Sequence, residues 1–226
     1  MFRCKTKMWI TCVCLPLLFI PLLSSCTNES TSSVSPTATT NPFDRLVFRD
    51  GFDSEDGSWH TYSTGNGSVL YENGKLHIKD YTDSEYVSPS GIQMQYSDFA
   101  LEVEMALVSG SSASCQIVIC RYSQTGSYYL FYIDGNGEYS IQKYIEGVWT
   151  TLKAATPSSY IKTGLGVTNE VRVDCVGDSL TLYVNGVSVA QASDGELAIG
   201  KVFLAVQSIG DEYTEAAFDN VVIWTS

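Results

Sequence analysis

Apolar and polar residues alternate along most of the chain from Arg45 onward, and Gly, Asn or Asp interrupts the alternation about every 8 to 12 residues. This spacing is typical of antiparallel strands folded into a sandwich or barrel. The clearest example is the segment 99–107, whose odd-numbered residues are large and apolar. They share one face of the predicted strand: Phe99, Leu101, Val103, Met105 and Leu107. The segment is therefore predicted to bury one face and to leave the other wet.

Turn signals support the same reading. Asn73-Gly74 and Asn185-Gly186 each separate two apolar runs, and Asn-Gly suits a type I′ hairpin turn because both central residues need positive φ. Further reversals are predicted at 134–137 and 146–147, which bracket strands at Tyr128–Ile133, Tyr139–Ile145 and Val148–Leu152. The whole pattern predicts roughly twelve to fourteen strands, which favours two packed sheets over one flat sheet.

The start of the chain has a different pattern. A basic stretch precedes an apolar run from Trp9 to Leu23, which is shorter than the about 20 residues that a spanning helix needs. The sequence Leu23-Ser24-Ser25-Cys26 resembles the lipobox of bacterial lipoproteins. It predicts a signal peptide over 1–25 and acylation of Cys26, whereas an ordinary secretory signal or an uncleaved anchor are the alternatives. A Ser/Thr-rich linker then completes the segment 26–44.

The lipobox interpretation predicts a protein anchored in the bacterial cell membrane through the acyl chains on Cys26, with the domain on the extracellular or periplasmic side. The formal net charge of −12 argues against binding to nucleic acid, because an acidic surface repels phosphates.

Several short stretches resemble the concanavalin A-like lectin/glucanase superfamily, in particular its laminin-G-like and keto-disaccharide-hydrolase-like bacterial branch. They are Phe48–Asp53 with Trp59, Ile119–Tyr122, Cys175–Gly186 and Phe218–Val222. The resemblance covers nearly all of residues 45–226. It implies an all-β fold, a two-sheet antiparallel jelly-roll sandwich, whose first and last strands lie together.

Cysteines suggest one crosslink at most besides Cys26. Cys115 and Cys120 cannot bridge one another, because five residues of a strand span roughly 16 Å and a disulfide needs Cα atoms within about 7 Å. A bridge would therefore join Cys175 to one of them, and the resemblance to the family implies Cys120. Three reduced, buried cysteines are the alternative.

Metal binding is suggested by acids at the two ends of the domain. If the first and last strands are adjacent, as the resemblance implies, Asp50, Asp53 and Asp219 gather oxygen ligands of the kind that Ca²⁺ prefers. The alternative is that these residues cap turns through their side chains. No cofactor other than a structural calcium is predicted.

Aromatic residues mark the candidate ligand face. The segment Tyr128–Ile133 is apolar on both faces, so Tyr129, Phe131 and Ile133 are predicted to lie in the core and the alternate residues on the open face. Sugars are commonly bound by aromatic rings together with a few polar groups. The predicted ligand-binding residues are Arg121, Tyr128, Tyr132, Tyr144 and Trp149. Aromatic pairs that only stabilise the sheet are the alternative.

No catalytic residue is assigned. Glu102 and Glu104 share a strand face, but glycosidases of the resembling superfamily carry a third acid that is missing here, so a solvated face is the preferred interpretation. His77 is interpreted as a surface or packed residue. The sequence therefore predicts a non-catalytic module that binds a glycan or another extracellular ligand. A cell-envelope glycoside hydrolase and a structural or adhesion protein-interaction module are the alternatives.

Overall fold

The computed structural model describes residues 43–82, 87–210 and 213–226. The predicted signal peptide 1–25, the acylated Cys26 and the linker up to residue 42 lie outside the described residues. In the described part, the regular structure consists of β-strands, and all strand pairings are antiparallel. A search of the same residues finds no helix with the length and apolar character of a membrane span.

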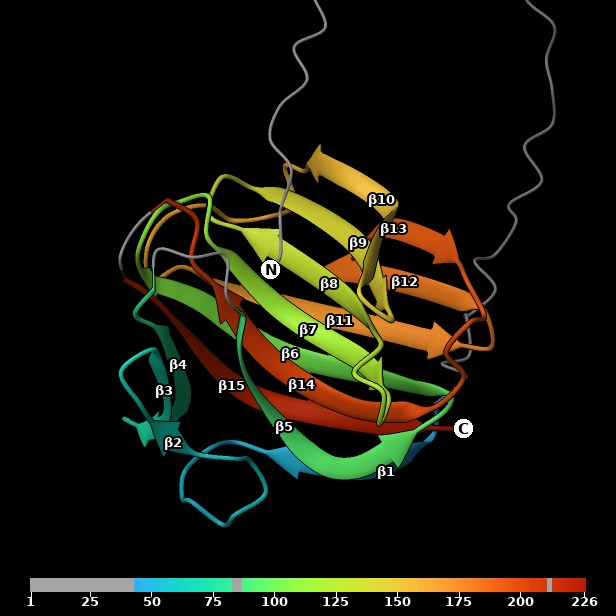
Figure 1. Cartoon of the computed structure of the whole chain (residues 1–226), viewed down its shortest axis with the longest axis horizontal. Helices are drawn as coiled ribbons and strands as arrows, with labels where there is room; N and C mark the ends of the chain where they lie inside the picture. Colours follow the sequence, from blue (N-terminus) through green and yellow to red (C-terminus); the bar gives the residue numbers. More distant parts are fainter. Residues whose placement is uncertain (1–42, 83–86, 211–212) are drawn as a thin grey trace, which may run out of the picture. The chain divides into compact units, whose positions relative to one another are not determined.

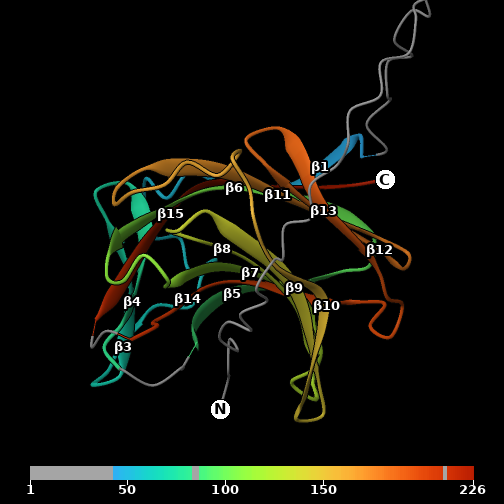
Figure 2. The same ribbon diagram turned by 90° about the horizontal axis from the view of Figure 1, so that it is seen from above.

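Two sheets form the two layers of the domain (Figures 1 and 2). In spatial order, the nine-stranded sheet contains β13 (Val187–Ser193), β12 (Ser179–Val184), β11 (Thr168–Val176), β6 (Phe99–Ser109), β15 (Thr214–Thr225), β4 (Lys75–Asp80), β3 (Gly67–Glu72) and β2 (Tyr62–Ser63), and β1 (Arg45–Asp50) also pairs with β15. The six-stranded sheet contains β10 (Val148–Pro157), β9 (Glu138–Ile145), β8 (Tyr128–Asp134), β7 (Cys115–Tyr122), β14 (Gly200–Gln207) and β5 (Val87–Tyr96). Figure 2 shows the two curved layers, with β6, β11 and β15 in one and β7, β8 and β14 in the other. The all-β sandwich that the sequence predicts is therefore confirmed.

The core lies between the inner faces of the two sheets. Phe99, Leu101 and Val103 of β6 are completely buried there, as the alternation predicts. Full burial of a large apolar side chain contributes about 1.5–3 kcal/mol. The other face of β6 is less wet than predicted, because neighbouring strands also bury Ala100 and Ala106.

The predicted connections between strands are also present. Asn73 and Asn185 have positive φ and are followed by positive-φ glycines, as a type I′ turn requires. Strand β1 pairs with β15 from Arg45–Thr225 to Asp50–Val221, so the first and last strands do lie together. Strand β1 thus lies beside the second half of β15, whose first half is paired with β4.

The start of the domain is held by a ring clasp, defined here as the contact of the Arg172 guanidinium with the rings of Phe43 and Tyr183. Phe43 is buried, and the guanidinium of Arg172 lies 5.9 Å from the centre of its ring and 5.5 Å from the centre of the Tyr183 ring. Asp174 accepts hydrogen bonds from the same guanidinium. The folded unit therefore begins before residue 45, with Phe43 as part of it.

Candidate ligand face on the six-stranded sheet

The six-stranded sheet sends alternate side chains to the core and to its outer face. Val118, Phe131 and Ile141 belong to the core, and so do Tyr129 and Ile133, as predicted. Cross-strand partners point to the same side of a sheet. The register pairs Tyr128 with Tyr144, and Tyr144 with Trp149, so all three project from the outer face.

These residues form part of an aromatic row, defined here as Phe203, Tyr122, Tyr128, Tyr144 and Trp149. One ring comes from each of five adjacent strands, β14, β7, β8, β9 and β10. Successive ring centres lie 4.8, 5.7, 5.5 and 5.0 Å apart, and Trp149 also meets Tyr128 edge-on at 5.9 Å. These separations lie in the range of favourable aromatic contacts.

Exposure differs along the aromatic row. Tyr128, at its centre, is buried with 5% of its surface exposed, whereas the other four residues are half-buried. Burial raises the pKa of the Tyr128 phenol above its usual range, and Tyr144 and Tyr122 add to the effect. Tyr128 is thus the packing centre of the aromatic row, and its neighbours offer more surface to a ligand.

Tyr132 projects from the same face but stands apart from the aromatic row. The pair Leu130–Gln142 separates it from the pair Tyr128–Tyr144 along strands β8 and β9. Its cross-strand partner is Ser140, whose hydroxyl donates a hydrogen bond to the Lys153 carbonyl. Tyr132 is also 5% exposed, so it belongs to the face without extending the row of ring contacts.

A bulge at Arg121 decides which residue of β7 joins the aromatic row. Strict alternation from Ile117 and Ile119 would put Arg121 on the outer face. Arg121 instead has a φ of 51°, and the register between β7 and β14 shifts beside it. The extra residue turns Arg121 inward and brings Tyr122 to the outer face, where it stacks on Tyr128.

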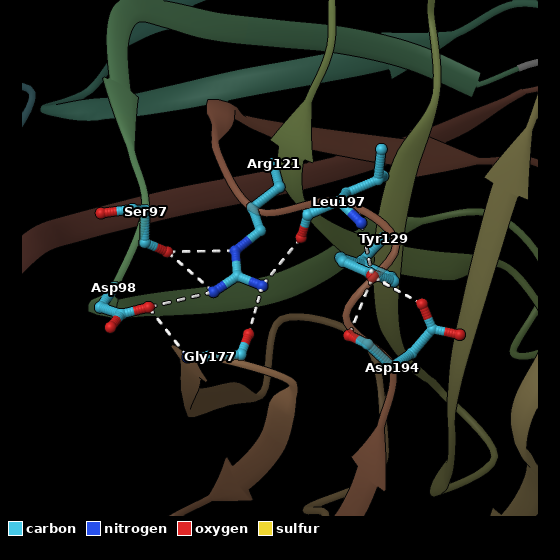
Figure 3. A network of polar contacts seen from close by, with 7 residues as sticks. All are labelled: Ser97, Asp98, Arg121, Tyr129, Gly177, Asp194 and Leu197. Atoms are coloured by element: carbon cyan, nitrogen blue, oxygen red, sulfur yellow. Dashed lines mark hydrogen bonds and ion pairs between the residues drawn. The ribbon is translucent and has the colours of Figure 1, made fainter.

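Arg121 is therefore not a neighbour of the rings on the open face, which corrects the prediction made from the sequence. Its guanidinium donates to the carbonyls of Ser97, Gly177 and Leu197 at 2.7–3.1 Å, and it contacts the Asp98 carboxylate at 3.3 Å (Figure 3). The side chain is 1% exposed. Arg121 joins three loops at one end of the sandwich.

A second part of this network involves Tyr129. Its hydroxyl donates to Asp194 and accepts from the Leu197 amide (Figure 3). Burial raises the pKa of Tyr129 to about 12. Burial acts against ionisation of Asp194 as well, but hydrogen bonds from Lys143 and Tyr129 lower the pKa of Asp194 overall. The network fixes the loop that contains Asp194 and Leu197 beside the six-stranded sheet.

Carboxylates are distributed unequally between the two outer faces. Glu102 and Glu104 project from the outer face of the nine-stranded sheet, opposite Arg172 and Glu170 of β11. Burial, and then the Glu170 charge, raise the pKa of Glu102. On the outer face of the six-stranded sheet, alternation places Asp134 at the end of β8 and Glu138 at the start of β9, and Asp134 Oδ1 accepts from the amides of Asn136 and Glu138. Burial, and then the Glu138 charge, raise the pKa of Asp134.

The three acids predicted to bind calcium have other contacts. Asp50 accepts from the Phe52 amide and from Trp59 Nε1, and Asp219 pairs with Lys75 at 3.3 Å. Asp53 lies between the turns that contain Gly51 and Gly74. The contacts of Asp50 match the turn-capping alternative, and calcium at these residues stays a prediction.

Sequence reasoning missed a different cluster on the outer face of the nine-stranded sheet. Within the described residues, Glu72, His77 and Glu215 place possible metal ligands within 4.8 Å of one another. His77 Nδ1 lies 2.5 Å from Glu215, and the Lys79 ammonium lies 3.1 Å from Glu72 and 3.7 Å from Glu215. Lys79 already balances the carboxylate charge there. No local motif could reveal the cluster, because His77 and Glu215 are 138 residues apart in sequence.

The predicted disulfide is not formed in the structure. Cys115, Cys120 and Cys175 are free, buried thiols. The predicted partners Cys120 and Cys175 both lie in the core between the two sheets. Burial raises the pKa of Cys120, so the thiolate that disulfide exchange requires is strongly disfavoured.

The two packed antiparallel sheets define a concanavalin A-like domain. More narrowly, the chain belongs to the 3-keto-alpha-glucoside-1,2-lyase-like domain family, whose sequence profile matches residues 45–224. The resemblance stated from the sequence is thereby confirmed. No curated protein matches the chain.

Solved structures support the fold. The carbohydrate-binding module CBM66 from Bacillus subtilis has a TM-score of 0.61 at 18% identity, over 74% of this chain and 96% of that chain. A LamA variant from Zobellia galactanivorans, solved in complex with laminaritriose and laminaritetraose, has a TM-score of 0.60 at 14% identity, over 81% and 100%. A protein of unknown function with a galectin-like fold from Bacillus subtilis has a TM-score of 0.61 at 10% identity, over 80% and 96%. These neighbours, each below 25% identity, show the fold of the chain.

Proposed function

We propose that this protein is a non-catalytic carbohydrate-binding domain, and that the glycan binds at the aromatic row of the six-stranded sheet. The single observation that carries the proposal is the alignment of five aromatic rings from five adjacent strands on one outer face. Aromatic rings contact the apolar C–H faces of sugars, while hydroxyl and amide groups fix orientation. The phenols of the row and the Gln142 amide supply such polar groups.

The distribution of acids favours binding over glycosidase chemistry. Hydrolysis of a glycoside typically uses two carboxyl groups about 5–9.5 Å apart on either side of the bond. Among the described side chains on the outer face of the six-stranded sheet, the carboxylates are Asp134 and Glu138. They lie together at the turn between β8 and β9, at the other end of these strands from Tyr128 and Tyr144, and Asp134 Oδ1 is engaged by two backbone amides. Glu102 and Glu104 belong to the other sheet and lie away from the aromatic row.

A second candidate is cleavage of a keto-sugar, because the matching family is described as 3-keto-alpha-glucoside-1,2-lyase-like. A 1,2-elimination removes the proton from C2, made acidic by the neighbouring carbonyl, and expels the leaving group from C1. It needs a general base within reach of C2. Burial raises the pKa of the Tyr128 phenol, which makes its ionised form scarce at neutral pH. The binding proposal requires no such base.

Residues 42–226 are suited to the test, because both sheets and the whole core belong to this compact unit. We expect the fragment to be retained by at least one glycan on an array, with neither reducing-end release nor formation of an unsaturated sugar from 3-keto-glucosides. Trp149→Ala should weaken retention about tenfold, because the packing of one aromatic ring on a sugar contributes on the order of 1.4 kcal/mol to the binding free energy. Tyr160→Ala removes a ring that is 54% exposed outside the aromatic row, and should have no effect.

Three outcomes contradict this proposal. Retention that is equal in Trp149→Ala and the unchanged fragment would exclude the aromatic row as the binding surface. Catalytic turnover of a glycoside or keto-glycoside by the purified fragment would show an enzyme instead. Absence of retention by the whole array would favour the protein-interaction alternative.

We further propose that the domain works at the cell surface or in the periplasm, attached through acylated Cys26. The lipobox-like Leu23-Ser24-Ser25-Cys26 supports this assignment. More than one acyl chain on one residue is enough for stable anchoring. Labelling with an alkynyl fatty acid should mark the full chain and leave Cys26→Ser unmarked, and a membrane fraction that retains Cys26→Ser would contradict the proposal.

A further inference from the structure

One end of the aromatic row is built differently from the rest. Phe203 is paired with Gly91 of β5, and a Cβ added at Gly91 would lie 2.4 Å from Phe203 Cδ1 and 2.5 Å from Cε1. The ring therefore lies directly against the backbone of β5, in the space that any other residue at position 91 would fill. This arrangement lays the ring of Phe203 over the sheet.

Tyr122 stands beside this ring as a second wall. The two ring centres are 4.8 Å apart and the planes meet at 54°. Both residues are half-buried, so part of each ring is accessible. Together they form an aromatic corner, defined here as Phe203 and Tyr122, with Gly91 beneath it.

A positively charged group borders the aromatic corner. Lys201 is the cross-strand partner of Tyr122. Because Val202 and Ile92 point into the core, Lys201 and Gln93 project from the outer face. The Lys201 ammonium donates to Gln93 Oε1 at 2.7 Å, and Gln93 is exposed.

The charge of Lys201 is not neutralised by the acids that the structure describes. In residues 43–82, 87–210 and 213–226, the lysines that form ion pairs with acids are Lys75, Lys79 and Lys143, and Lys201 is not among them. The carboxylates on the same face, Asp134 and Glu138, lie at the turn between β8 and β9. Asp134 is in the row of Cys115 and Gln207, at the opposite end of β14 from Lys201. What distinguishes Lys201 is its place, because its side chain lies beside two aromatic rings on the outer face.

From this arrangement we infer that the aromatic corner is a subsite for an anionic sugar residue, such as a uronic acid. The ring of the sugar contacts Phe203 and Tyr122, and its carboxylate pairs with the Lys201 ammonium, while the Gln93 amide binds a neighbouring hydroxyl. The inference rests on the proposed function and names its ligand class. A charge-assisted hydrogen bond gives a carboxylate a selective advantage over its neutral ester.

The experiment compares a polyuronate with its methyl ester, which differ in charge and share the same backbone. We expect the fragment 42–226 to bind polygalacturonate about tenfold more tightly than fully methyl-esterified polygalacturonate, and the advantage to shrink as NaCl is raised. Lys201→Gln should abolish the advantage by lowering the affinity for polygalacturonate about tenfold. Lys162→Gln is the matched control, because it removes the same charge from an exposed site elsewhere.

Phe203→Ala tests the ring contact separately from the charge, because it should weaken binding of the charged and the neutral polymer alike. Thermal melting establishes that each variant is folded before its affinity is compared. Equal affinity of the unchanged fragment for both polymers, or an acid preference that survives Lys201→Gln, overturns the anionic subsite while the glycan-binding proposal stands. Failure to bind both polymers, together with retention by a neutral glycan, also overturns the subsite alone. Absence of binding to every glycan tested overturns both.

Discussion

The two outer faces of the sandwich use the same β scaffold for opposite chemistry. The nine-stranded sheet carries paired charges, such as Arg172 with Asp174 and Lys79 with Glu72 and Glu215. The six-stranded sheet carries the aromatic row, the Gln142 amide and the corner beside Lys201. The comparison shows that charged side chains on the outer face of the nine-stranded sheet mainly pair with one another. The outer face of the six-stranded sheet instead presents aromatic and polar groups that suit an external ligand.

We expect the largest effect from replacing Arg121, whose side chain connects loops from both sheets. Arg121→Met removes the buried guanidinium that donates to three loop carbonyls, so we expect a loss of about 2–3 kcal/mol in the free energy of unfolding. The bulge should relax, and the near-ultraviolet circular dichroism of the stacked Tyr122 and Tyr128 should change. Urea denaturation measures the first effect. A variant as stable as the parent would show that the network is not structural.

The thiols between the sheets offer a second test. Because Cys115, Cys120 and Cys175 are buried, we expect the folded fragment to react with a thiol reagent at least about a hundredfold more slowly than the unfolded one. In denaturant without reductant, the purified fragment should release a signal for three thiols. A signal for one thiol would show that two sulfurs had been joined.

The faces themselves can be compared directly through one variant on each. Tyr144→Ala opens a gap in the aromatic row and should lower glycan affinity about tenfold, the amount expected for an aromatic contact of on the order of 1.4 kcal/mol. Glu104→Gln, on the nine-stranded sheet, should leave affinity unchanged. Titration calorimetry measures both, and a loss confined to Glu104→Gln would move the binding surface to the other sheet.

The smallest effect concerns pH and the charged face. Burial opposes ionisation of Glu215, but hydrogen bonds from Tyr213 and His77 and the Lys79 charge lower its pKa overall. A carboxyl whose pKa is lower in the folded state stabilises the fold above its unfolded pKa, and this contribution is lost as pH falls through the folded pKa. Glu215→Gln should therefore cost about 1 kcal/mol at neutral pH and nothing in strong acid. Melting curves from pH 7 down to pH 2 make the comparison, and a constant difference would contradict it.

The sequence was sufficient for the sandwich because alternation and turn chemistry act locally. Tyr128, Tyr144 and Trp149 were also predictable, since their strands are regular and each faces the expected side. The prediction put Arg121 on the outer face where the structure has Tyr122, because a single positive-φ residue reverses the alternation at the end of β7. Nothing in the sequence pattern marks that bulge in advance.

Other features required the three-dimensional pairing of distant strands. Phe203 joins the aromatic row only because β14 lies beside β7 and Gly91 makes room for the ring. The cluster of Glu72, His77 and Glu215 depends on β15 lying beside β4. Long-range register is set by the whole core, so these neighbours do not follow from any local motif.

The contact between Phe43 and Arg172 has a mechanical consequence under the proposal that the domain is tethered through its upstream segment. A pull from that side meets Phe43, held on the Arg172 guanidinium, before it reaches the hydrogen bonds of β1. Tension is thus passed through Arg172 into β11, in the interior of the nine-stranded sheet, rather than unzipping the terminal strand from its end. The contact between Phe43 and Arg172 would therefore bear part of the load before the hydrogen bonds between β1 and β15 do.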